Sequence, residues 1–263
     1  MNPVKFSSTV DEKTGVPLIS IYGKQRKPSL DSLKNIDVII FDIQDVGVRF
    51  YTYISSMHYM MEASADAGVS FIVLDRPNPN GAYVDGPLLE KEFSSFVGMH
   101  KIPLLHGMTV AELAQMFTGE KWLNITKSLD LTVIPVEHYQ RDMFYSLPIK
   151  PSPNLPNDQA IALYPSLGFF EATPVSIGRG TAFPFQVIGH DKFFTEQVDV
   201  NKFSFTPIST PGAALKPKLM DKVLKGQDLR KVSSKGLDLS FLIRWSTLFK
   251  DNKTLFFSRA SFM

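Results

Sequence analysis

The fold is decided by residues 36–75, which read 36-IDVIIFDIQDVGVRFYTYISSMHYMMEASADAGVSFIVLD-75. The run from Asp37 to Ile43 is almost continuously β-branched and aromatic, which predicts a strand buried on both faces of a parallel sheet. Apolar residues then recur at helical spacing from Tyr51 to Ala67 and stop at Gly68, a residue typical of the position after a helix end. A second buried strand is expected from Val69 to Leu74, so the stretch predicts one βαβ unit.

Each predicted strand closes on an aspartate, Asp42 in the first case and Asp75 in the second. Ligands of parallel sheets bind beyond the carboxyl ends of the strands. We therefore expect both carboxylates on one functional edge of the sheet.

Three further elements can be placed along the chain. A helix is predicted from Leu104 to Thr118, because Thr109 and Glu112 have the spacing of a capping box. A third strand of the same sheet is expected from Leu131 to Val136, and an amphipathic helix from Leu239 to Phe249.

The proline-rich segment 148-PIKPSPNLP-156 can form neither a helix nor a central strand. It marks the expected boundary between an α/β domain, residues 1–148, and a second domain, residues 149–263.

The composition excludes several classes of protein. The 263 residues carry 28 Lys and Arg against 26 Asp and Glu, a net charge of +2 without a basic cluster, so neither a nucleic acid nor a membrane is expected as a partner. Cysteine is absent, which rules out disulfides, thiolate metal sites and a cysteine nucleophile. Residues 1–10 lack the apolar core of a signal peptide, and no stretch reaches the length of a membrane span.

The first candidate site is the segment 41-FDIQDVGVRFYTY-53, where many polar groups directly follow a buried strand. Such groups are costly unless they bind one another or a ligand. The candidates are Asp42, Gln44, Asp45, Arg49, Tyr51 and Tyr53. In the structural alternative, which we weigh about equally, Asp45 caps the helix and Arg49 pairs with Asp42.

A second and a third candidate follow further along the chain. In 75-DRPNPNG-81 the two prolines hold the backbone extended, so Asp75, Arg76 and Asn78 could bind ligand hydroxyls at fixed spacing. His106 directly precedes the capped helix and could donate a hydrogen bond to a ligand. Structural roles, a turn for the first group and loop closure for His106, are the more common outcome for such residues.

The fourth candidate is 171-EATPVSIGRGTAFPF-185, in which Glu171, Ser176, Arg179 and Thr181 surround two glycines. A Gly-Arg-Gly turn would let the backbone approach a ligand, and the guanidinium would offer two parallel donors to a carboxylate. The chain has no phosphate-loop or dinucleotide-binding glycine pattern and no Gly-x-Ser-x-Gly, and its five histidines show no metal-ligand spacing. We therefore expect neither a metal nor a cofactor.

Taken together, these segments resemble the exo-β-N-acetylmuramidase family, formerly a family of unknown function, whose members remove terminal N-acetylmuramic acid from peptidoglycan fragments. The matching strings are 14-TGVPLISIYG-23, 41-FDIQDVGVRFYTY-53, 74-LDRPNPNG-81, 102-IPLLHGMTVAELA-114, 151-PSPNLP-156 and 176-SIGRGTAFPF-185. The resemblance implies a Rossmann-like N-terminal domain, a smaller α+β C-terminal domain, a cleft between them and no nucleotide cofactor. It also implies an amino-sugar or muropeptide substrate and adds Asn154 to the binding candidates.

The sequence departs from the family pattern in two places. Family members carry an upstream Pro-Glu-His-Gly motif that supplies the main catalytic glutamate, and this string does not occur here. The end 255-LFFSRASFM-263 stops in an apolar run. We therefore expect a chain truncated at both ends, lacking the first elements of its N-terminal domain, which agrees with a missing export signal in a family whose members are usually exported.

Glycoside hydrolysis needs a proton donor and a second group that acts as base or nucleophile. If the upstream glutamate is the donor, Asp42 and Asp45 are the first candidates for the second group and Asp75 the next, with His106 as a further catalytic candidate. Arg179 is expected to bind the lactyl carboxylate that distinguishes muramic acid from N-acetylglucosamine. The main rival is a catalytically inactive sugar-binding remnant, and a nucleotide-binding α/β domain is the third hypothesis.

Overall fold

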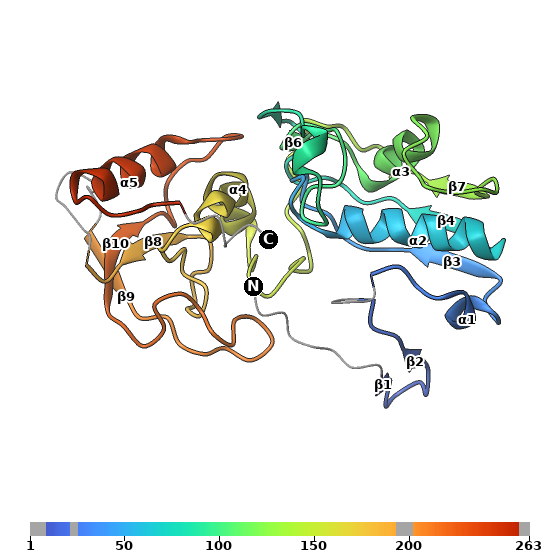
Figure 1. Ribbon diagram of the computed structural model, residues 1–263, viewed down its shortest axis with the longest axis horizontal. Helices are drawn as coiled ribbons and strands as arrows, with labels where there is room; N and C mark the ends of the chain where they lie inside the picture. The colour runs from blue at the N-terminus through green and yellow to red at the C-terminus, as the bar shows by residue number, and fades with distance from the viewer. Residues whose placement is uncertain (1–8, 22–25, 193–201, 258–263) are drawn as a thin grey trace. The chain divides into compact units, whose positions relative to one another are not determined.

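The computed structural model describes residues 9–21, 26–192 and 202–257, and its chain divides into two compact units between Tyr145 and Ser146 (Figure 1). Tyr22 and Gly23 of the string 14–23, and residues 258–263 of the C-terminal run, lie outside the described residues.

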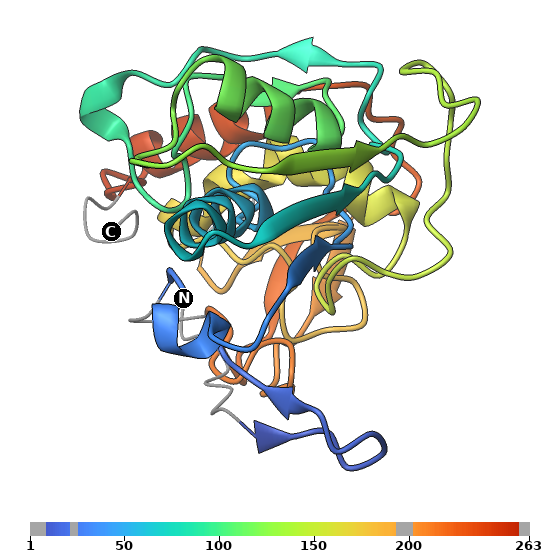
Figure 2. The same ribbon diagram turned by 90° about the vertical axis from the view of Figure 1, so that its right-hand side faces the viewer.

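The βαβ unit predicted from residues 36–75 is present in the first unit. Strands β3 (Val38–Phe41) and β4 (Ser70–Leu74) are parallel and are joined by helix α2 (Tyr53–Ala67), which ends at Gly68 with a φ of +70°. Strand β7 (Leu131–Ile134) pairs in parallel with the other side of β4, so the sheet order is β3-β4-β7. Figure 2 shows the three arrows pointing the same way. The predicted third strand is confirmed.

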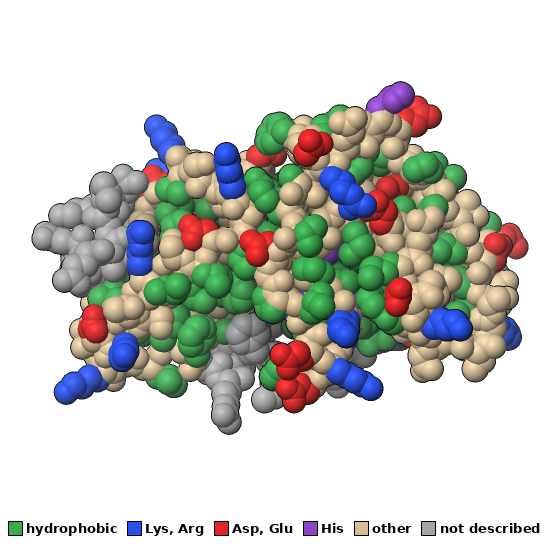
Figure 3. All heavy atoms as spheres, turned by 90° about the horizontal axis from the view of Figure 1, so that it is seen from above, with side chains coloured by type: hydrophobic (Ala, Val, Ile, Leu, Met, Phe, Trp, Pro, Cys, Tyr) green, Lys and Arg blue, Asp and Glu red, His purple; other side chains and the backbone are tan. Residues whose placement is uncertain are grey.

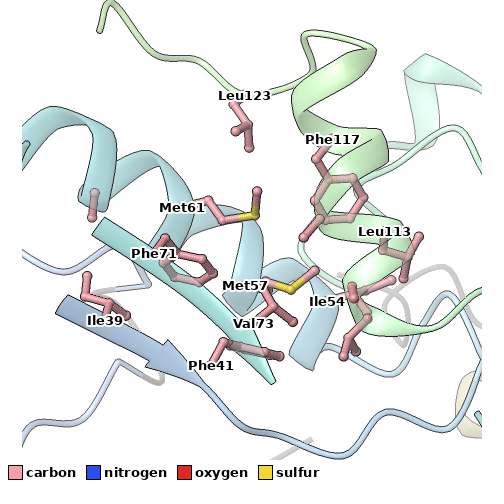
Figure 4. Packing of buried hydrophobic residues seen from close by; sticks show 14 of the residues in the cluster. Ile39, Phe41, Ile54, Met57, Met61, Phe71, Val73, Leu113, Phe117 and Leu123 are labelled. Atoms are coloured by element: carbon pink, nitrogen blue, oxygen red, sulfur yellow. The ribbon is translucent and has the colours of Figure 1, made fainter. Parts of the chain in front are cut away.

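One face of this sheet carries the hydrophobic core of the first unit. Figure 4 shows Phe41, Phe71 and Val73 of the sheet packed against side chains of α2 and of helix α3 (Val110–Gly119), Met57 and Phe117 among them. Because residues alternate between the faces of a strand, every second side chain enters this core.

The prediction that the first strand is buried on both faces is wrong. Val38 and Ile40 are 43% and 59% exposed, whereas their neighbours Ile39 and Phe41 are buried. Helices α2 and α3 supply the core on the Ile39 and Phe41 side only. The apolar run therefore reflects strand propensity and not burial on two sides.

The capping box predicted for the next helix is confirmed, but the helix starts later than expected. Thr109 accepts a hydrogen bond from the backbone N–H of Glu112, and the Glu112 side chain accepts one from the backbone N–H of Thr109. Leu105 and His106 belong instead to strand β6 (Leu105–His106), which pairs with β5 (Val84–Asp85). The remaining elements of this unit are β1 (Thr9–Val10), β2 (Pro17–Leu18), α1 (Leu30–Leu33) and the 3₁₀ helix η1 (Lys91–Phe93).

The second unit combines helices with an antiparallel sheet. Helix α4 (Asp158–Leu167) leads into the 3₁₀ helix η2 (Gly168–Ala172). Strands β8 (Val187–His190), β9 (Lys202–Phe205) and β10 (Leu224–Asp228) form a sheet of order β8-β10-β9, and helix α5 (Ser240–Asp251) follows. The chain thus has an α/β fold with an α+β second unit, as expected. The amphipathic helix predicted over residues 239–249 corresponds to α5.

The surface shows no concentration of one charge on the face drawn in Figure 3, where acidic and basic side chains alternate with hydrophobic ones. Among residues 9–21, 26–192 and 202–257, no helix has the length and apolar character needed to cross a membrane.

The aromatic core of the first unit gives a direct stability prediction. Phe71 is fully buried, so its replacement by alanine is expected to lower the free energy of unfolding by about 3–5 kcal/mol through lost burial and a residual cavity. Urea unfolding followed by fluorescence measures this change. The matched control is Phe93→Ala, because Phe93 is 67% exposed and its loss should change stability by less than about 0.5 kcal/mol. Equal effects of the two substitutions would contradict the assigned core.

Candidate functional site

Polar side chains follow two neighbouring parallel strands at the carboxyl edge of the first unit's sheet. Asp42 comes after β3, and Asp75 and Arg76 come after β4. Arg76 donates from Nε to Asp42 Oδ1 over 2.7 Å, and its Nη2 lies 2.6 Å from the same oxygen. The Asp42 side chain is 47% exposed, so it is open to a ligand.

The predicted pair between Arg49 and Asp42 is wrong. Arg49 Nη1 donates instead to the backbone oxygens of Pro87 and Ile102, at 2.7 and 2.6 Å. Arg76 takes the place at Asp42 because β4 lies next to β3, so the residues that follow the two strands meet at one edge. Arg49 fastens a loop.

Asp45 and His106 form a buried pair in the same unit. Their side chains are 4% and 0% exposed, and His106 Nε2 lies 3.4 Å from Asp45 Oδ2. Asp45 Oδ2 also accepts a hydrogen bond from the backbone N–H of Gly47 at 2.7 Å. The prediction that Asp45 caps the helix is therefore wrong; the N-cap of α2 is Thr52, which makes no side-chain cap bond.

The hydrogen bonds around this pair define the His106 tautomer. His106 Nδ1 accepts a hydrogen bond from the backbone N–H of Met108 at 3.2 Å, which leaves Nε2 as the ring nitrogen that carries a proton toward Asp45. Yet Asp45 Oδ1 and His106 Nε2 are buried and have no hydrogen-bond partner among the described residues. A buried polar atom without a partner costs about 1–3 kcal/mol.

Amide side chains hold the loops around this pair in place. Asn78 donates from Nδ2 to the Met108 carbonyl at 3.0 Å and accepts from the backbone N–H of Asn80 at 2.9 Å. Gln44 Nε2 donates to the carbonyls of Asp45 and Pro77, at 2.7 and 2.8 Å. Asn78 is buried, so it acts as a structural link between loops and not as a ligand-facing group.

Asp75 links the end of β4 to the start of α3. Its Oδ1 accepts a hydrogen bond from the backbone N–H of Ala111 at 3.0 Å. Burial raises the pKa of the Asp75 carboxyl above its ordinary value, against the opposing hydrogen bonds from Ala111 and Thr109. Near the same edge, the rings of Tyr51 and Tyr53 meet edge to face, with centroids 5.0 Å apart.

Two further histidines lie together in the core, although they are far apart in the sequence. His100 Nε2 and His58 Nδ1 are 3.0 Å apart, and His58 Nε2 lies 3.1 Å from Glu62 Oε1. Burial lowers the pKa of His100 to about 3. Among the residues the structure describes, no group of three or more histidine, aspartate or glutamate side chains is arranged to hold a metal ion.

A separate polar cluster lies in the second unit. Arg179 Nη1 donates to Glu171 Oε1 at 2.9 Å, and Arg179 Nη2 donates to the carbonyl of Ala213 at 3.4 Å. Asn154 Nδ2 donates to the same carbonyl at 3.0 Å. Arg179 thus links two other predicted binding residues, Glu171 by a direct contact and Asn154 through the shared Ala213 carbonyl. Lys218, which the sequence did not single out, lies beside them and donates to the carbonyls of Phe170 and Glu171.

The two glycines beside Arg179 are required by the path of the chain's own backbone. Both have a positive φ, +80° at Gly178 and +83° at Gly180. A Cβ on Gly178 would meet the Phe183 carbonyl at 2.5 Å, and one on Gly180 would meet the Ile208 carbonyl at 2.5 Å. The glycines therefore permit close approach of the chain's own backbone.

Ser176 and Thr181 complete the same turn by internal hydrogen bonds. Ser176 is buried and accepts from the Gly178 N–H at 3.3 Å, and Thr181 donates to the Gly178 carbonyl at 2.7 Å. Both side chains thus hold the turn that presents Arg179.

Comparison with known proteins assigns the chain to a family. The model of the N-terminal part of exo-beta-N-acetylmuramidase NamZ matches residues 2–159, and the model of its C-terminal part matches residues 162–248. The chain belongs to the NamZ family. A curated relative from Bacillus subtilis, peptidoglycan beta-N-acetylmuramidase NamZ, is 51% identical over 190 residues, which are 70% of this chain and 45% of the relative. The chain thus spans less than half the length of that relative.

Two solved structures from Bacteroides fragilis, both of DUF1343 family proteins, share the fold. The first has a TM-score of 0.85 at 46% sequence identity, and the match covers 96% of this chain and 69% of the Bacteroides chain. The second has a TM-score of 0.77 at 32% sequence identity, and the match covers 92% of this chain and 67% of the Bacteroides chain.

Both polar clusters lie in segments that the NamZ models match. Asp42, Asp45 and His106 lie in the N-terminal match, and Glu171 and Arg179 lie in the C-terminal one. The candidate residues of both units therefore lie within the parts of the chain that define it as a NamZ family member.

Proposed function

We propose that this NamZ family protein is an exo-β-N-acetylmuramidase, a glycoside hydrolase that releases terminal β-linked N-acetylmuramic acid from peptidoglycan fragments. The observation that carries the proposal is the match of both NamZ parts to one chain, together with 51% identity to a curated peptidoglycan β-N-acetylmuramidase. Clusters of polar groups at the sheet edge of the first unit and around Arg179 in the second support it.

Within this proposal, the four catalytic candidates take different roles. Asp42 has an exposed carboxylate after a parallel strand, so it is the group that meets the sugar and serves as base or nucleophile, while a separate acid protonates the leaving oxygen. Asp45 and His106 are buried and cannot touch a substrate in this structure, so they act as positioning residues beneath the loop that follows β3. Asp75 fixes the end of β4 to α3 and thereby holds Arg76 beside Asp42.

Two disaccharides of opposite order test the proposed reaction. The chain is incubated with N-acetylmuramic acid β-1,4-linked to N-acetylglucosamine, and separately with the reverse disaccharide, and the products are identified by mass spectrometry. An exo-muramidase splits only the disaccharide whose non-reducing end is muramic acid. Binding of this disaccharide without cleavage would favour the inactive sugar-binding alternative, and cleavage of the reverse disaccharide alone would refute the proposal.

A further inference from the structure

Lys218 is a partly buried cation in the second unit. Its Nζ donates hydrogen bonds to the carbonyls of Phe170 and Glu171, each at 2.7 Å. An ammonium group has three N–H donors, and these carbonyls, at the end of η2, account for two of them. The third donor remains for a ligand.

The charges around Lys218 do not balance. The charged groups that act on it are Glu171, which attracts, and Arg179, which repels. Glu171 already pairs with Arg179 at 2.9 Å, so two positive charges share one carboxylate. Charged groups withdrawn from water are normally paired. The cluster therefore lacks one negative charge.

The cluster is open enough for a ligand to supply that charge. The side chains of Arg179 and Glu171 are 26% and 20% exposed. Arg179 uses one nitrogen for Glu171 and another for the Ala213 carbonyl, whereas a guanidinium has five N–H donors. Asn154 also holds the Ala213 carbonyl, which fixes the loop that leads to Lys218.

We propose that Lys218 and Arg179 together bind a carboxylate of the ligand, and that this carboxylate is the lactyl group of N-acetylmuramic acid. The inference rests on the proposed function for the identity of the ligand. Glu171 holds Arg179 in place, and the bonds of Lys218 to η2 hold its ammonium beside the pair. Lys218 is thus a specificity-determining residue of the second unit.

Because the charge of Lys218 changes with pH, binding of the carboxylate is expected to depend on pH. Burial, together with the nearby Arg179, lowers the pKa of Lys218 to about 8, with Glu171 acting in the opposite direction. Lys218 is charged below this pH and neutral above it. A lactyl carboxylate, with a pKa of about 3.5, stays ionised throughout this range. Affinity for N-acetylmuramic acid is therefore expected to fall as the pH rises through 8.

The test is a titration of the chain with N-acetylmuramic acid and with its lactyl methyl ester at pH values from 6.5 to 9.5. The wild-type affinity for the acid should fall about tenfold across this range, while the affinity for the neutral ester stays constant. Lys218→Met should weaken binding of the acid at pH 7 by about 10- to 100-fold and abolish the pH dependence, with the ester unaffected. Lys218→Arg should bind the acid with no loss at high pH, because its guanidinium stays charged.

A matched control is Lys216→Met, which removes an exposed lysine two residues away and should change nothing. Equal weakening of acid and ester by Lys218→Met, or a pH dependence that persists in Lys218→Arg, would overturn the inference and leave the muramidase proposal standing. A wild-type chain that binds neither ligand would refute both. If Lys218→Met does not fold, the wild-type and Lys218→Arg profiles still decide the question.

Discussion

Replacing Asp42 by asparagine is expected to lower kcat on a β-N-acetylmuramide by about 10²- to 10⁴-fold, the usual contribution of a positioned acid or base. The substitution keeps the shape of the side chain and removes its charge. Asp42 and Arg76 form a half-exposed pair, so the change should alter the free energy of unfolding by no more than about 1 kcal/mol. Steady-state kinetics and urea unfolding of the same preparation separate the two effects.

The same strand offers a matched control for Asp42. Asp37 is an exposed aspartate just before β3, whereas Asp42 lies just after it, so Asp37→Asn removes the same charge from the opposite end of the strand. Asp37→Asn should keep wild-type turnover. Equal activity of the two variants would show that Asp42 takes no part in the reaction.

Gly47→Ala is expected to have the largest effect of any substitution near the buried pair. Gly47 has a φ of +76°, and a Cβ at this position would fall well inside the contact distance of the Asn78 amide. Asn78 cannot yield easily, because it is bonded to Met108 and Asn80. Left-handed strain and overpacking together should cost about 2–5 kcal/mol in stability. Gly47 also contacts both members of the pair, through its N–H to Asp45 and its carbonyl to the His106 N–H, so turnover should fall as well.

Gly68→Ala is the control that separates backbone strain from steric crowding at Gly47. Gly68 has a similar φ of +70°, but a Cβ there would meet nothing within 4 Å. Its replacement should therefore cost only the backbone strain, about 1–2 kcal/mol, and leave turnover unchanged. The loss of stability in both variants is measured from the midpoints of urea unfolding curves that have equal slopes. A loss at Gly68 as large as that at Gly47 would contradict the close approach to Asn78.

Local patterns predicted the parallel strands β3, β4 and β7 and the helices α2 and α3 of the first unit, because their signals lie within a few residues. The capping box of Thr109 and Glu112 and the stop of α2 at Gly68 were both readable in this way. The burial of β3 was not, since Val38 and Ile40 have the same strand propensity whether or not a helix covers them. Whether a helix packs on a given face of β3 depends on contacts between distant segments, which the hydrophobic pattern does not encode.

The sequence predicted which residues belong to the candidate site better than it predicted which of them contact one another. Parallel pairing correctly placed Asp42 and Asp75 after neighbouring strands, but the partner of Asp42 is Arg76 and not Arg49. The contact of Asp45 with His106 joins the loop after β3 to strand β6, which lie far apart in the sequence, and left no local signal. Lys218 was missed for the same reason, since its environment comes from η2 and Arg179 and not from neighbouring residues in the sequence.

The proposed activity of this chain is hydrolysis of β-linked N-acetylmuramic acid in preference to other amino sugars. The most direct measurement compares nitrophenol release from the 4-nitrophenyl β-glycosides of N-acetylmuramic acid and of N-acetylglucosamine, which differ only in the lactyl group. We expect release from the muramic acid glycoside and little or none from the glucosamine glycoside. Absence of release from both glycosides, or equal rates on the two, would contradict the claim.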